Sequence, residues 1–174
     1  MFDFLQAAID TFRKQKELAE RAMVQLGEDR LHVAIHPETN SIAVIVKHLA
    51  GNMRSRWTDF LTSDGEKPWR DRDDEFIDTF TSREEVMSAW EAGWSCLFQA
   101  LESLGEADME KQITIRGEPL SVPLAMLRQI DHYGYHVGQI VLIARILAED
   151  NWRVLSIPRG QSRQYNERVW QGKR

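Results

Sequence analysis

Residues 123–149, PLAMLRQIDHYGYHVGQIVLIARILAE, decide the fold because they predict one long, enclosed helix. Pro123 suits the first turn of a helix, where its missing N–H costs no hydrogen bond. The later turns, from Gly138 onward, are apolar on most sides, as is typical of a helix surrounded by other helices. Gly134 and Gly138 lie one turn apart and leave room for another helix to come close.

Three segments upstream of this helix also show the helical period, with apolar side chains recurring every three to four positions. Their boundaries carry residues that begin or end helices. Asn40 or Ser41 is a good N-cap for the second segment, and Ser82 with Glu85 forms a capping box at the start of the third. The expected helices are 2–26, 41–61 and 82–105.

Two connections are longer than a simple turn. Residues 62–80 are polar and show no sustained period, and a connection of this length tends to carry function or to cross between distant elements. Ahead of the last helix, Ile113 and Ile115 alternate with polar residues, and residues 116–118 can turn, so we expect a small hairpin or an irregular segment there.

The pattern as a whole predicts an all-α four-helix bundle with a long crossover connection, in a single domain over residues 1–174. Hydrophobic residues make up 43% of the chain, which is enough for a core that needs no disulfide. The one cysteine, Cys96, cannot form an internal disulfide, and its apolar neighbours favour a packing role in a reducing cytoplasm. The sequence shows neither a signal peptide nor a run of ~20 apolar residues that would span a membrane.

Charge is distributed unevenly along the chain. The net charge of −5 disfavours nucleic-acid binding. Residues 151–174 nevertheless carry six basic side chains against the single acidic Glu167, a local balance of +5 that leaves −10 for the rest of the chain. We expect this basic C-terminal tail to pack on the acidic body as a solvated end.

Histidines are the residues that point to chemistry. His132 and His136 stand four apart on a predicted helix, so they share a face, and both can turn toward one cation because imidazole–metal bonds are ~2.0–2.1 Å long. Such pairs also arise as ordinary surface neighbours. His48 lies mid-helix at the edge of an apolar stripe and can point obliquely into a bundle. Together the three histidines would hold a metal with open coordination positions. The alternative is that His48 is a hydrogen-bonded residue at the boundary of the core.

The other histidines serve as a comparison. His32 and His36 have the same spacing, but Pro37 disfavours helical geometry at His36, so we expect both in loops. Asn52 and Asp131 are near the candidate ligands in sequence and are candidates to hydrogen-bond them. Tyr133 and Tyr135 lie between His132 and His136 in the chain, and we expect both to serve in packing.

The sequence resembles the DinB/YfiT superfamily of metalloenzyme-like proteins. The resemblance rests on NSIAVIVKHLAGN (40–52) followed by LRQIDHYGYHVGQIVLIARIL (127–147), in that order. GEKPWRDRDDEF (65–76) and SIPRGQSRQYN (156–166) are similar to stretches of one DinB-like branch. The resemblance extends over nearly the whole chain.

This resemblance implies a four-helix bundle, a homodimer, and a divalent metal, zinc or nickel, held by His48, His132 and His136. Relatives include S-transferases that use low-molecular-weight thiols, so the activity it implies first is transfer of such a thiol to an electrophile. A metal-dependent hydrolase and a non-enzymatic, dimeric metal-binding bundle stay open as alternatives.

Arginines are candidates to hold an anionic substrate of such an enzyme. Arg159 and Arg163 lie in the basic tail, and Arg70 and Arg72 lie in the long connection. A guanidinium can bind a carboxylate through two parallel hydrogen bonds. Surface salt bridges with the acidic body are the alternative role.

Overall fold

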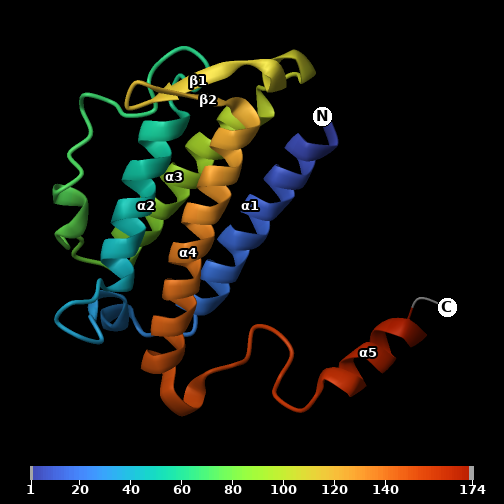
Figure 1. Ribbon diagram of the computed structural model, residues 1–174. Helices are drawn as coiled ribbons and strands as arrows, with labels where there is room; N and C mark the ends of the chain where they lie inside the picture. The colour runs from blue at the N-terminus through green and yellow to red at the C-terminus, as the bar shows by residue number, and fades with distance from the viewer. Residues whose placement is uncertain (1, 173–174) are drawn as a thin grey trace.

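The computed structural model describes residues 2–172, and over this range the chain is mostly helical, as predicted. The four long helices α1 to α4 lie side by side, and a small antiparallel hairpin crosses one end of them (Figure 1). The elements are α1 (Phe2–Met23), α2 (Ile42–Trp57), α3 (Arg83–Glu102), β1 (Gln112–Ile115), β2 (Glu118–Ser121), α4 (Val122–Ala148) and α5 (Ser162–Gln171).

Serine side chains begin three of these helices. The hydroxyl of Ser41 accepts a hydrogen bond from the N–H of Val44 at 3.2 Å, and Ser82 and Ser121 cap α3 and α4 in the same way. The predicted capping box at α3 is wrong in its second half. The carboxylate of Glu85 accepts a hydrogen bond from the N–H of Thr81 rather than from that of the N-cap Ser82.

The helices end earlier than the apolar pattern predicts. Beyond the last turn of α1, α2 and α3, the apolar side chains of Leu26, Phe60 and Leu104 are still buried. A buried position requires only that the chain stays against the core, not that it stays helical. Thr58 has extended torsions, with φ −66° and ψ 128°, which end α2, and Asp59 follows with a positive φ of 49°.

The core lies between the four long helices. Phe12 of α1 packs edge-on against Trp57 of α2 and Trp94 of α3, with ring centroids 6.1 and 6.4 Å apart. Helices α2 and α3 approach closely at Gly93, where a Cβ would lie 2.9 Å from the Cα of Ala50. This interior is apolar enough that polar side chains facing it need partners of their own.

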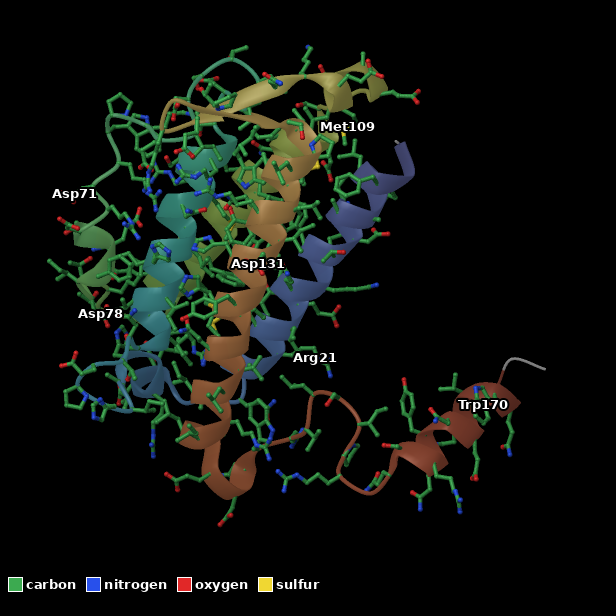
Figure 2. The ribbon with its side chains drawn as sticks, in the orientation of Figure 1. Arg21, Asp71, Asp78, Met109, Asp131 and Trp170 are labelled. Atoms are coloured by element: carbon green, nitrogen blue, oxygen red, sulfur yellow. The ribbon has the colours of Figure 1, made fainter. Side chains whose placement is uncertain are left out.

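The long connection between α2 and α3 lies along the outer side of α2. Its short 3₁₀ helix, Asp74–Phe76, contacts α2, and the labelled Asp71 and Asp78 mark the two sides of it in Figure 2. A Cβ at Gly51 would lie 2.7 Å from Cδ of Glu75. Glycine at this position of α2 therefore lets the Glu75 side chain come against the helix.

The predicted hairpin is confirmed, with its turn at Arg116 and Gly117. Both residues have positive φ, 56° and 76°, as a two-residue hairpin turn requires. The carboxylate of Asp64 accepts hydrogen bonds from both turn N–H groups, at 2.9 and 2.8 Å. This contact ties the hairpin to the long connection and fixes the position of Arg116.

The chain after α4 has two parts. Its first residues lie on the body: Trp152 and Leu155 pack against the core, and the N–H of Arg153 donates to the side chain of Gln25 at 2.6 Å. Helix α5, which the sequence analysis does not predict, has no buried residue and extends away from the other helices (Figure 1). The first residues of the basic tail thus contact the body, as predicted for the tail as a whole. None of the helices described combines the length and the apolar character of a bilayer crossing.

Candidate metal centre

Three histidines that are far apart in the chain meet between α2 and α4. Each of His48, His132 and His136 offers a ring nitrogen, and these nitrogens all lie within 4.8 Å of one another. Nε2 of His48 is 3.3 Å from Nε2 of His132. The cluster forms because α2 and α4 are in contact and the two α4 histidines are one turn apart.

Hydrogen bonds outside the cluster orient two of the three rings. Nδ1 of His48 lies 2.9 Å from Oε2 of Glu75, and since a carboxylate only accepts, Nδ1 is the donor and Nε2 is the ring nitrogen that faces the cluster. Nδ1 of His136 donates in the same way to Oε1 of Gln139 at 2.8 Å. Outer partners of this kind hold the tautomer of histidines that bind metals.

The donor set fits a divalent cation. Two nitrogens bound to one tetrahedral zinc at ~2.0–2.1 Å are ~3.3–3.4 Å apart, and the His48–His132 separation of 3.3 Å matches that value. Imidazole nitrogens are ligands that zinc and nickel accept readily. The three residues present therefore fit the ion that the sequence resemblance implies.

Burial keeps the α4 histidines in the neutral form that binds metals. It lowers the pKa of His132 from 6.5 to about 3, and the neighbouring His136 and His48 add to the effect. Burial also lowers the pKa of His136, against the hydrogen bond to Gln139 that favours its charged form. At neutral pH these rings do not need to lose a proton before they bind a cation.

The cluster is backed by a buried ion pair. Glu75 is 5% exposed, and its two carboxylate oxygens accept hydrogen bonds from Nε and Nη2 of Arg70 at 2.7 and 2.8 Å. Burial raises the pKa of Glu75, but the hydrogen bonds from Arg70 and His48 outweigh it and leave that pKa below its usual range. The carboxylate thus stays charged while it holds the ring of His48.

An open cleft of about 400 Å³ leads to the cluster, and His48 and His132 form part of its wall. Five arginines also line it, and we call them the cleft arginines: Arg56, Arg70, Arg72, Arg116 and Arg128.

Of the four arginines predicted to hold a substrate, the structure brings Arg70 and Arg72 to this cleft. Arg159 and Arg163 are exposed and lie in the tail, outside the residues that line it. The other three cleft arginines were not predicted from the sequence: Arg56 comes from α2, Arg116 from the hairpin turn and Arg128 from α4.

The remaining candidates fall outside the cluster, as two of them were expected to do. His32 ends the short 3₁₀ helix Glu28–His32, so its predicted loop position is wrong, and it pairs with Asp78 at 2.8 Å. His36 lies in a loop, as predicted. Asn52 accepts a hydrogen bond from the Tyr133 hydroxyl at 3.1 Å and, in the described structure, bonds to none of the three clustered histidines.

Asp131 and the two tyrosines of α4 differ in burial and in whether they line the cleft. Asp131 is exposed and lines the cleft, and no hydrogen bond joins it to a clustered histidine within residues 2–172. Tyr133 is fully buried, which confirms its packing role. Tyr135 is 64% exposed and lines the cleft, so its predicted packing role is wrong.

The two partners that orient the rings were both missed in the sequence. Gln139 stands three residues after His136 on the same helix, so helical spacing alone can find it. Glu75 is separated from His48 by 27 positions and by a connection without periodicity, so no local pattern points to it.

The helical fold and the three converging histidines define a class of helical proteins with a site compatible with metal binding. Within that class, the chain belongs to the family DUF1572, whose model matches residues 1–161 and whose description is a protein of unknown function. Comparison with curated proteins and with solved structures gave no significant match.

Acidification is expected to destabilise the metal-free protein between pH 6.5 and about 3. Over this range the unfolded chain binds a proton at residue 132, whereas the folded protein does not, because its His132 pKa is about 3. Stability therefore rises with pH, and the loss on acidification is roughly 2 kcal/mol once partial solvent screening of the ring is allowed for. Urea unfolding at several pH values checks this. His132→Gln is expected to show a shallower pH slope, and an equal slope in both proteins would contradict the assignment.

Proposed function

We propose that α1 to α4 form a DinB/YfiT-like four-helix bundle in which His48, His132 and His136 hold one divalent metal ion, zinc or nickel. The observation that carries the proposal is the convergence of the three imidazoles, two of which, His48 and His132, line an open cleft. Structural zinc sites are closed by four protein ligands, whereas catalytic sites use three and keep a position for a small molecule. Three ligands beside a cleft favour the catalytic kind.

The proposed activity is transfer of a low-molecular-weight thiol to an electrophilic carbon. A divalent ion, when bound, lowers the pKa of a coordinated thiol. The neutral imidazoles add no charge, so the ion would keep its full double charge at the site. Glu75 holds the ring of His48 in place, and the cleft positions the reactants. In the overall reaction the sulfur forms a bond to carbon, the leaving group departs with the electron pair of its bond, and the thiol proton goes to solvent.

A homodimer is part of the proposal, and the exposed side of α4 supports it. Leu127, Leu142 and Ile146 are 49%, 57% and 48% exposed, and a Cβ at Gly138 would meet nothing within 4 Å. Half-exposed leucines and isoleucines along one helix suit a contact between two copies of the chain.

A bimane-conjugation assay tests the proposed activity. Purified protein is incubated with a chloroalkyl bimane and a panel of thiols, with and without the neutral chelator 1,10-phenanthroline. We expect conjugation that the chelator abolishes and that added zinc or nickel restores. Bound metal without chelator-sensitive turnover would instead favour the non-enzymatic metal-binding bundle, and chelator-sensitive ester cleavage would favour the hydrolase. Sedimentation of the same preparation reports the oligomeric state.

A further inference from the structure

The cleft beside the histidines carries more positive charge than its acidic neighbours neutralise. Against the five cleft arginines stand three carboxylates: Glu66 and Glu75, which pair with some of them, and Asp131 on the cleft wall. The chain as a whole has a net charge of −5, so this excess is local. A concave site lined by one sign of charge concentrates ions of the opposite sign.

The ion pairs of the cleft do not give each arginine its own carboxylate. Glu66 is shared, because the same oxygen lies 3.0 Å from both Arg56 and Arg116. Arg72 of the long connection and Arg128 of α4 form no ion pair with any residue between 2 and 172. Guanidinium groups that reach one cleft from the connection, the hairpin turn and α4 can bind separate anionic groups of one molecule.

Two buried side chains of the cleft also have unused hydrogen-bonding capacity. Gln129 is 3% exposed, and its Oε1 has no hydrogen-bond partner in the described structure. Arg56 is 5% exposed, and its Nε likewise has none among the described residues. Leaving such buried groups unpaired costs free energy.

We propose that this cleft binds a small organic molecule with two or more anionic groups, carboxylates or phosphates, held by Arg72, Arg116 and Arg128. The inference rests on the proposed function in one respect. The bound molecule would be one of the two substrates of the histidine centre, either an acidic thiol or an acidic electrophile. Anion binding itself requires the arginines and not the metal.

Calorimetric titration tests the proposal with two probes, tricarballylate for carboxylates and pyrophosphate for phosphates. Wild-type protein is compared with Arg128→Gln and with Arg159→Gln, which removes the same charge from the tail. We expect millimolar or tighter binding of at least one probe, weakened ~10- to 100-fold by Arg128→Gln, as loss of a charged hydrogen bond predicts. Arg159→Gln is expected to change it less than ~3-fold, as a distant screened charge should. Whichever probe binds more tightly identifies the anionic group.

Two results would overturn the proposal. One is the absence of binding of both probes to the wild-type protein, and the other is equal weakening by the two substitutions. Each titration is repeated after metal removal with 1,10-phenanthroline, which is uncharged and does not compete for arginines. Binding that disappears with the metal and ignores Arg128→Gln would place the anion on the ion, which also refutes the arginine site. A protein that binds a probe but takes up neither zinc nor nickel when these are added would refute the proposed metal centre while leaving the cleft proposal in force.

Discussion

His48→Ala is expected to empty the metal centre of the purified protein. His48 is the one histidine that α2 contributes, and without it the two α4 rings are left as a pair. Loss of a mere outer partner lowers metal affinity by ~10- to 100-fold, so loss of a ligand should exceed ~100-fold. Elemental analysis by plasma mass spectrometry should find about one zinc or nickel per wild-type chain and almost none in the variant.

A matched control distinguishes the loss of a metal ligand from the loss of any histidine side chain. His32→Ala removes the same side chain from a position where the ring pairs with Asp78 instead of joining the cluster. It should leave the metal content unchanged. If His48→Ala retains metal at the level of His32→Ala, the three rings do not form the site, however close they lie. Circular dichroism of both variants establishes that the comparison is made between folded proteins.

The parts of the fold that the sequence predicts are those governed by local rules. Helical period and the predicted caps place the starts of α2 and α3 within one or two residues, and Pro123 does the same for α4. Alternation at Ile113 and Ile115 places the hairpin. The pair of His132 and His136 follows from helical geometry alone. That His48 joins them depends on which face of α2 meets α4, and the sequence indicates this only through an apolar stripe with His48 at its edge.

What escapes prediction is set by contacts between distant segments. Glu75 reaches His48 only because the connection folds back along α2 and because Gly51 leaves space for its carboxylate. Arg116 enters the cleft because Asp64 holds the hairpin turn. Nothing in the sequence around Arg159 distinguishes it from Arg128 as a substrate ligand, so charge and residue type alone suggested the tail.

Glu75→Ala is expected to destabilise the metal-free protein by ~3–5 kcal/mol, the usual cost of leaving one member of a buried ion pair without its partner. The side chain of Arg70 is 2% exposed and donates two hydrogen bonds to Glu75. Glu66, 3.5 Å away, offers it only a weak remaining contact. Urea unfolding of wild type and variant, both stripped of metal, gives the difference. Asp73→Ala, an exposed carboxylate of the same connection, should change stability by less than ~0.5 kcal/mol.

A second substitution shows whether the buried charge is the cause. In Glu75→Ala with Arg70→Met the cation is gone, so most of the lost stability should return, although His48 still lacks its acceptor. The double variant should therefore fold well and yet bind metal ~10- to 100-fold more weakly than wild type, because the ring of His48 is no longer held. If the double variant is as unstable as Glu75→Ala alone, the loss comes from packing. If it binds metal as tightly as wild type, Glu75 does not orient the ligand and the centre needs only its three imidazoles.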